Sequence, residues 1–235
     1  MYQLDLNSWD VLNGWTQLSD DTRQEYLKAY HNAGKKLLVS AFGASEWPTT
    51  AGVDPAVSAN NVADFVIKWG FDGCWTAEQW LITYTRVLRQ RLPSPQYIVS
   101  HAPQAPYFFA GVYSGGGYLA IHQAVGDLID FYNVQYYNQG SASYDTCETL
   151  FYQAGAWAAG SSVFEIAAAG VPLNKIVVGK PITPQGAANT GYMDAYSLAA
   201  CFPEAKAKGW NGGVMGWQYS LDPSFNWISV LSASL

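Results

Sequence analysis

The stretch FYNVQYYN at residues 131–138 alternates polar and apolar side chains. Along a β-strand, this alternation places Asn133, Gln135 and Tyr137 on one face, while the other face carries apolar side chains that suit packing against helices. An amide beside a phenol can bind an amide or a sugar hydroxyl. The competing interpretation, a buried layer of hydrogen-bonded side chains, accounts for the same pattern equally well.

A second candidate lies near the carboxyl end of the chain, in the sequence GGVMGWQY at residues 212–219. Its glycines permit close packing, and alternation places Met215, Trp217 and Tyr219 on one face. A tryptophan at the end of a strand can stack on the apolar face of a pyranose ring. A tryptophan in the hydrophobic core is the simpler interpretation of Trp217 taken alone.

Strands and helices alternate along the chain and would position these residues. The predicted strands cover residues 36–42, 97–100, 131–137, 175–180 and 213–217. Helices are predicted from the N-cap Ser19 to Gly34, at 62–69 before Gly70, and near 119–128, 146–153, 163–169 and 195–208. A capping box of Thr76 and Gln79 predicts the start of a further helix that carries Trp80 and Leu88.

Repeated strand–helix units with nearly continuous apolar strands predict a parallel sheet in an α/β fold, and their number favours a (β/α)8 barrel over an open sheet. The length of 235 residues fits a single domain, 1–235. Two features predict that the barrel is incomplete. No sequence remains for a strand before the one that starts near Tyr2, and only about three or four strand residues fit between Trp69 and Thr76.

The composition limits the partners. Lys and Arg number 12 against 18 Asp and Glu, for a net charge of −6 without a basic run, so nucleic acid and anionic membranes are poor partners. A charged fraction of 13% with 10 Trp and 16 Tyr suits a protein that offers aromatic faces to neutral polar ligands. No apolar stretch is long enough to predict a membrane span, and the first residues lack the features of a signal peptide.

Three cysteines, Cys74, Cys147 and Cys201, are scattered along the sequence without the spacing of a metal site. No metal and no cofactor is predicted. At most one disulfide can form, and buried free thiols are the favoured interpretation.

Several of these segments together resemble glycoside hydrolase family 18. Residues 130–138 are similar to its sixth-strand motif and residues 212–217 to its eighth strand. Further similarities, partly to members of the fungal chitinase type, lie at residues 40–43, where Phe42 replaces a glycine, and at 100–103 and 175–181. The resemblance implies a (β/α)8 barrel that acts on β-1,4-linked N-acetylglucosamine, as a chitinase or an endo-β-N-acetylglucosaminidase.

The fourth-strand segment departs from the family pattern. The family signature there is Asp-Gly-x-Asp-x-Asp-x-Glu, in which the Glu is the general acid. This chain has DGCWTAEQ at residues 72–79, so Asp72 matches the first aspartate and Gln79 occupies the position of the acid. Glu78 is one residue out of register, which in a strand reverses the face. The resemblance therefore implies that the segment with the catalytic carboxylates is absent from this chain.

In family 18 the acetamido oxygen of the sugar attacks the anomeric carbon, while an acid protonates the leaving oxygen. By resemblance, Tyr137 hydrogen-bonds the acetamido carbonyl, Asp72 has a supporting role, and Glu78 is a weak substitute for the acid. The substrate-binding residues implied by the resemblance are Gln135, Asn138, Met215, Trp217 and Tyr219.

Three hypotheses follow. The chain binds chitooligosaccharide or N-glycan like a lectin, with hydrolysis lost or very weak. Alternatively, it is an active glycosidase whose acid is Glu78 or comes from a segment outside this sequence. The third hypothesis is a shortened product without a ligand, which self-associates through open barrel edges instead of remaining a monomer. The family resemblance implies a secreted protein.

Overall fold

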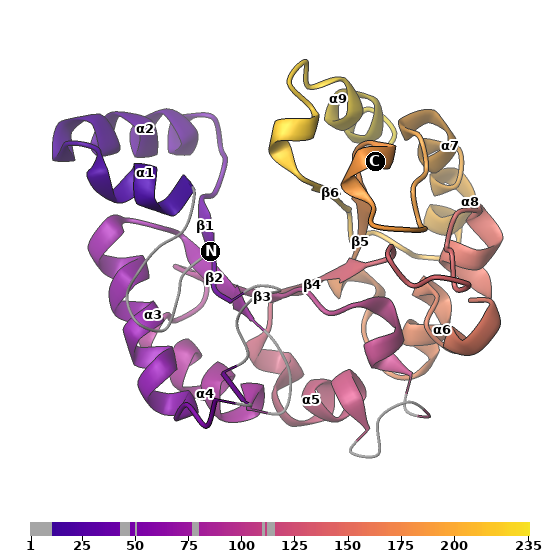
Figure 1. The fold of residues 1–235 in the computed structure, drawn as a ribbon, viewed down its shortest axis with the longest axis horizontal. Helices are drawn as coiled ribbons and strands as arrows, with labels where there is room; N and C mark the ends of the chain where they lie inside the picture. The colour runs from indigo at the N-terminus through magenta and orange to yellow at the C-terminus, as the bar shows by residue number, and fades with distance from the viewer. Residues whose placement is uncertain (1–10, 43–47, 50, 77–79, 110, 112–115) are drawn as a thin grey trace. The chain divides into compact units, whose positions relative to one another are not determined.

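The computed structural model describes residues 11–42, 48, 49, 51–76, 80–109, 111 and 116–235. Throughout these residues, parallel strands alternate with helices (Figure 1). The chain divides into two compact units. The first comprises Met1–His101 with Ala124–Asp130, and the second comprises Ala102–Gln123 with Phe131–Leu235.

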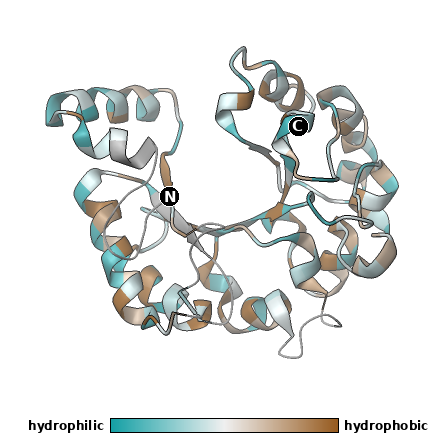
Figure 2. Cartoon of the chain, in the orientation of Figure 1, coloured by the Kyte–Doolittle hydropathy of each residue, from teal (hydrophilic) through white to brown (hydrophobic). Residues whose placement is uncertain are grey.

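The first unit contains three parallel strands in the order β1 (Leu38–Ser40), β2 (Gly73–Thr76) and β3 (Ile98–His101). Its α-helices are α1 (Val11–Gln17), α2 (Asp20–Asn32), α3 (Pro55–Trp69) and α4 (Leu81–Arg91). Helices α3 and α4 pack against each other and against the strands. Hydrophobic and hydrophilic residues are interspersed along these helices (Figure 2), and the buried residues of α3 include Val62 and Val66.

Local capping signals in the first unit are confirmed. Helix α2 begins after Ser19, whose hydroxyl accepts a hydrogen bond from the Thr22 amide at 3.2 Å. Helix α3 ends at Gly70, which has a φ of 76° and therefore adopts the left-handed conformation of a helix C-cap. The strand predicted at 36–42 is shorter and covers only Leu38–Ser40.

The expected start of the fourth helix is wrong. Thr76 is the last residue of β2, where it is paired with His101 of β3, and α4 begins only at Leu81. Thr76 is thus part of the sheet and does not start the helix that the capping box predicts. The prediction of a strand of three or four residues at this place is confirmed, because β2 has four. Gln79 and Glu78 lie outside the described residues.

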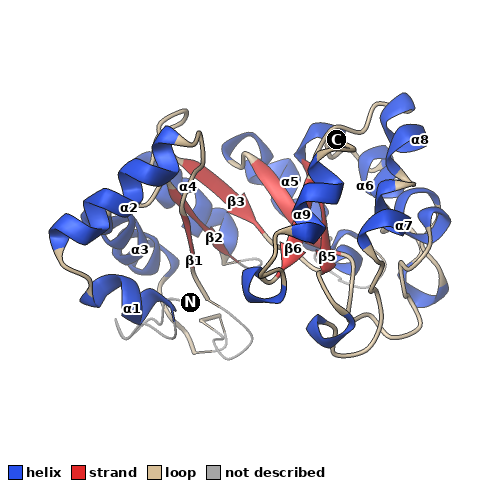
Figure 3. Ribbon diagram, turned by 90° about the horizontal axis from the view of Figure 1, so that it is seen from above, coloured by secondary structure: helices blue, strands red, loops and turns tan. Residues whose placement is uncertain are grey.

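The second unit also contains three parallel strands, in the order β4 (Phe131–Gln135), β5 (Ile176–Pro181) and β6 (Val214–Trp217). Figure 3 draws the strands in red and labels β5 and β6. Its regular α-helices are α6 (Val163–Ala168), α7 (Ala195–Ala199), α8 (Phe202–Ala207) and α9 (Asn226–Ser232), together with most of α5 (Gly117–Val125). Its shorter helical turns are η1 (Ala105–Phe108), η3 (Glu148–Tyr152), η4 (Ala156–Ala158), η5 (Leu173–Lys175), η6 (Pro184–Gly186) and η7 (Tyr219–Leu221), while η2 (Gly126–Leu128) belongs to the first unit.

The apolar face of β4 lies in the core of this unit. Tyr132, Val134 and Tyr136 are fully buried, as the alternation predicts. The predicted helix at 195–208 is instead two helices, α7 and α8, which meet at Ala200 and Cys201. The break has a local cause, because Pro203 in the first turn of α8 has no amide hydrogen and cannot continue the hydrogen-bond ladder of α7.

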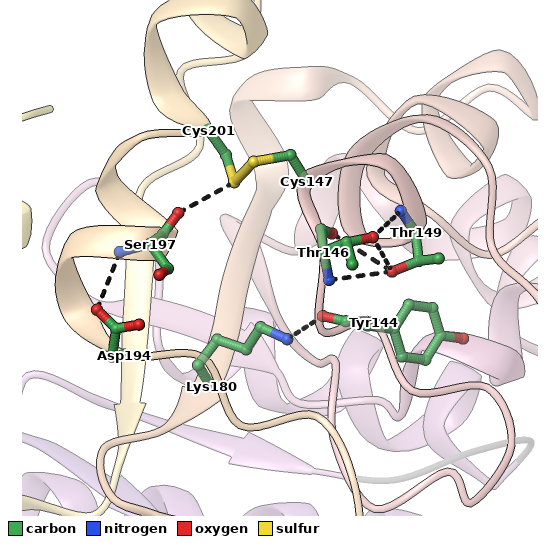
Figure 4. The surroundings of a disulfide bond; sticks show 8 residues. All are labelled: Tyr144, Thr146, Cys147, Thr149, Lys180, Asp194, Ser197 and Cys201. Carbon is green, nitrogen blue, oxygen red and sulfur yellow. Dashed lines mark hydrogen bonds between the residues drawn. A yellow bond between two sulfur atoms is a disulfide. The ribbon is translucent and has the colours of Figure 1, made fainter.

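A disulfide joins Cys147, just before η3, to Cys201 at the start of α8 (Figure 4). The two α-carbons lie 5.3 Å apart, although 54 positions separate the residues in the sequence. The expectation of free thiols is therefore wrong for these two cysteines. Their pairing depends on a contact between distant segments, which sequence spacing does not reveal.

No helix in the described part of the chain is long and apolar enough to cross a membrane.

Candidate carbohydrate-binding site

The carboxyl ends of β4 and β6 carry most of the predicted site residues, and both strands belong to the second unit. The strand register aligns Gln135 of β4 with Gly179 of β5, and Gly179 with Met215 of β6. A β-carbon on Gly179 would lie 2.7 Å from the Met215 methyl group and 2.6 Å from the Val134 carbonyl oxygen. The glycine therefore lets the Met215 side chain lie over β5, between the two strands that carry the site.

Gln135 has a fixed side-chain orientation. Its Nε2 donates a hydrogen bond of 2.7 Å to the carbonyl oxygen of Ala102, and its backbone amide donates to the Pro103 carbonyl at 2.8 Å. Because the amino half of the side-chain amide is held by Ala102, its oxygen is the half that suits a donor on a ligand. Gln135 is only partly buried. The hydrogen bond to Ala102 agrees with the interpretation as a hydrogen-bonded layer, and the binding role of Gln135 stays a prediction.

Tyr137 lies two residues beyond Gln135 and is 5% exposed. Burial raises the pKa of its phenol well above the ordinary value. The hydroxyl consequently keeps its proton at physiological pH and can act as a hydrogen-bond donor. A donor is the group that an acetamido carbonyl oxygen requires.

Asn138 is held by the loop that follows β5. Its backbone has a φ of 63°, and its Oδ1 accepts hydrogen bonds from the amides of Ala188 at 2.7 Å and Asn189 at 3.3 Å. Asparagine is among the residues that tolerate this left-handed conformation best. These contacts give Asn138 a structural role at the end of β4, next to Tyr137.

Trp217 is the last residue of β6 and is 42% exposed, whereas Trp210 in the same unit is 1% exposed. The interpretation of Trp217 as a core residue is therefore wrong. Tyr219 is 74% exposed, and its ring packs against that of Phe225 with 5.9 Å between the centroids. Two exposed aromatic side chains thus follow one another at the end of this strand.

Asp72 lies at the amino end of β2, in the first unit. Its carboxylate accepts hydrogen bonds from the Leu37 amide at 2.7 Å and from His31 Nε2 at 3.1 Å, and it lies 3.4 Å from Lys36 Nζ. Partial burial favours the neutral acid, but these contacts prevail and lower the pKa of Asp72. The group is a stable carboxylate and not a proton donor at neutral pH.

Three neighbours of the site were not singled out from the sequence: Ala102, Gly191 and Lys180. Ala102 acts through its backbone carbonyl, and Gly191 packs against the backbone of Tyr137. Lys180 stands inside the apolar strand β5. No group of three or more His, Cys, Asp or Glu side chains suited to a metal ion occurs among the described residues.

Solved structures of glycosidases share the fold of this chain. A family 18 chitinase from Pseudoalteromonas aurantia is 29% identical to this chain, with a TM-score of 0.77 over 93% of this chain and 81% of that protein. A fungal endo-beta-N-acetylglucosaminidase from glycosyl hydrolase family 18 is 22% identical, with a TM-score of 0.67 over 91% of this chain and 76% of that protein. The chain is similar to glycoside hydrolase family 18 proteins in sequence and fold.

The similarity to the chitinase structure confirms the predicted fold class, an incomplete (β/α)8 barrel, to which the described residues contribute the parallel strands β1–β6. A xylanase and alpha-amylase inhibitor protein from Scadoxus multiflorus shares the fold, at 20% identity and a TM-score of 0.62 over 92% of this chain and 81% of that protein. No protein-family model and no curated protein matches the sequence.

Proposed function

We propose that this chain is a family 18-type domain that binds oligosaccharides of β-1,4-linked N-acetylglucosamine and hydrolyses them very slowly or not at all. One observation carries the proposal: the exposed Trp217 of β6 and the polar face of β4 occur at the carboxyl ends of strands in one compact unit. The similar chitinase and endo-beta-N-acetylglucosaminidase structures support glycans of this class as ligands.

Tyr137 and all the predicted substrate-binding residues except Asn138 have a chemical role in this proposal. The indole of Trp217 stacks on the apolar face of one sugar ring. The Tyr137 hydroxyl donates to the acetamido carbonyl, and the Gln135 side chain, held by Ala102, accepts a hydrogen bond from the sugar. Met215 supplies an apolar surface between the two strands, and Tyr219 extends the aromatic surface beyond Trp217.

Weak hydrolysis follows from the sequence at residues 72–79. In register with the family signature, the position of the general acid is occupied by Gln79, and an amide has no proton to give at neutral pH. Asp72 is held as a carboxylate by Leu37 and His31. General acid catalysis typically increases the reaction rate 10²–10⁴-fold. Without it, the leaving oxygen is not protonated when the acetamido group attacks, so hydrolysis is slow.

The binding half of the proposal is tested by isothermal titration of chitopentaose into the wild-type protein and Trp217→Ala. We expect the substitution to weaken binding by about tenfold or more, because a stacked aromatic platform is removed. Tyr196→Ala is the matched control, since Tyr196 is an aromatic residue on α7 that is 69% exposed. Equal affinity of the wild type and Trp217→Ala would show that the proposed site is wrong.

The catalytic half is tested by mass spectrometry of chitopentaose after long incubation, with a control that lacks protein. We expect the substrate to remain intact. Shortened products would favour the alternative hypothesis of an active glycosidase, which the 29% identity to a chitinase also supports. In that case Glu78→Gln should abolish the products if Glu78 is the acid.

A further inference from the structure

Lys180 is a buried cation in the second unit. It lies in β5 between Gly179 and Pro181 and is 0% exposed. Its Nζ donates three hydrogen bonds, to the carbonyl oxygens of Tyr136 at 3.0 Å, Tyr144 at 2.5 Å and Gly191 at 2.9 Å. The three N–H groups of an ammonium ion are thereby all used.

The three acceptors belong to two loops. Tyr136 is the first residue of the segment 136–147, here called the β4 loop, and Tyr144 lies near the other end of this loop. Gly191 belongs to the segment 182–193, here called the β5 loop. Figure 4 shows Lys180 reaching the Tyr144 carbonyl, just before the disulfide at Cys147. One side-chain atom therefore connects both ends of one loop with the other loop.

Additional hydrogen bonds join the same two loops. The Asn138 amide donates to the Thr190 carbonyl at 2.8 Å, and the Thr190 hydroxyl donates to the Gly140 carbonyl at 2.8 Å. The Gly140 amide donates to Asn189 Oδ1 at 3.1 Å. Tyr137 lies in the backbone between the Tyr136 carbonyl and Asn138, so its position depends on both sets of contacts.

Packing alone does not require a charge at this position. An apolar side chain of similar length would fill the space without the cost of removing a cation from water, and replacing buried charges in this way is often neutral or stabilising. The ammonium group instead provides directional hydrogen bonds, because three carbonyl oxygens from two loops accept from one nitrogen atom. These hydrogen bonds thus fix the position of the β4 loop relative to the β5 loop.

We propose that Lys180 is a positioning residue of the glycan site: its ammonium group clamps the β4 loop to the β5 loop and thereby fixes the backbone of Tyr137. The part of this inference that concerns glycan affinity rests on the proposed function, while the clamp itself does not. Lys180 does not contact the sugar and acts through Tyr137.

Hydrogen exchange tests the clamp directly. In Lys180→Met, amide exchange in peptides covering 138–146 and 187–192 should be about tenfold faster, while peptides from α6 remain unchanged. Lys206→Met is the matched control, because Lys206 is an exposed lysine on α8 of the same unit. Equal exchange in a folded Lys180→Met protein would overturn the clamp.

Chitotetraose titration tests the positioning role. We expect Lys180→Met to bind about tenfold more weakly than the wild type, with Lys206→Met unchanged. Unchanged affinity in Lys180→Met, together with faster exchange, would overturn the link to Tyr137 but keep the clamp. If the wild type does not bind the sugar, the proposed function fails, and hydrogen exchange still decides on the clamp.

A measurement on the wild type covers the case in which Lys180→Met does not fold. A neutral amine has two N–H groups for three carbonyl oxygens, so chitotetraose affinity should fall several-fold between pH 6 and pH 9. Burial lowers the pKa of Lys180 to about 7, and the nearby Asp145 carboxylate opposes this shift. A constant affinity over this range would overturn the positioning role.

Discussion

A β-carbon on Gly191 would lie 2.7 Å from the β-carbon of Tyr137 and 2.7 Å from the Tyr136 carbonyl oxygen. Gly191 also has a φ of 98°, which L-amino acids with a side chain rarely adopt. The β5 loop therefore lies directly against the backbone of the proposed sugar-binding tyrosine, at a point with no room for a side chain.

Gly191→Ala should destabilise the protein by about 2–4 kcal/mol, which combines the conformational cost of a positive φ with overpacking against Tyr137. The free energy of unfolding in urea measures this loss. Gly170→Ala is the matched control, because Gly170 has a φ of 110° but no atom within 4 Å of its hypothetical β-carbon. If both variants lose the same free energy of unfolding, overpacking against Tyr137 contributes nothing to the loss in Gly191→Ala.

Stability should rise with pH between about 7 and 10 because of Lys180. In the fold its pKa is lowered from 10.5 to about 7, so the unfolded chain binds more protons in this range. The contribution to the slope is at most about 1.4 kcal/mol per pH unit. Urea unfolding at pH 7, 8, 9 and 10 should show a smaller slope for Lys180→Met than for Lys206→Met.

The tyrosines around Lys180 predict the opposite trend at higher pH. Burial raises the pKa of Tyr144 to about 12 and also raises that of Tyr136 well above its ordinary value. The two rings pack against each other with 5.3 Å between their centroids. A pKa that is raised in the fold contributes stability below about pH 10, which is lost as the pH rises through the folded value. A stability that still increases above pH 10.5 would contradict this assignment.

Reduction of the Cys147–Cys201 disulfide should lower the free energy of unfolding by about 4 kcal/mol, the loop-closure value for residues 54 positions apart. Urea unfolding with and without dithiothreitol provides the measurement. The double variant Cys147→Ser/Cys201→Ser should match the reduced wild type and be insensitive to the reductant. An effect of dithiothreitol on the double variant would indicate that Cys74 or another process is responsible.

Asp72→Asn should destabilise the first unit by about 1–2 kcal/mol at pH 7, because the contacts to Leu37, His31 and Lys36 favour the carboxylate. The pKa of Asp72 is lowered in the fold, so this contribution is present above about pH 4 and disappears as the pH falls through the folded value. Asp64→Asn is the comparison, since the Asp64–Arg91 ion pair is exposed and should matter little.

Local patterns in the sequence predict much of this fold. The alternation at 131–137 correctly gives the buried face of β4, and Ser19 and Gly70 mark the ends of their helices. These signals work because alternation, capping and left-handed glycines depend on neighbouring residues. For the same reason the positions of Gln135 and Trp217 at strand ends could be predicted from the sequence.

Features that depend on distant contacts could not be predicted. The capping box at Thr76 is a valid local signal, but pairing with β3 prevails there. The disulfide joins segments whose proximity follows from the packing of η3 and α8. Lys180 stands in the sequence IVVGKP without any sign that three carbonyl oxygens converge on it, since those belong to residues up to 44 positions away.

The Cys147–Cys201 bond closes a covalent ring that includes β5, Lys180 and the whole β5 loop. Pro184 and Asn189 in that loop are exposed, so a protease that cuts between them breaks the chain inside the ring. The two pieces then remain one molecule, and they separate only when the disulfide is reduced. In an oxidising environment the proposed glycan site can therefore survive a cut in the β5 loop.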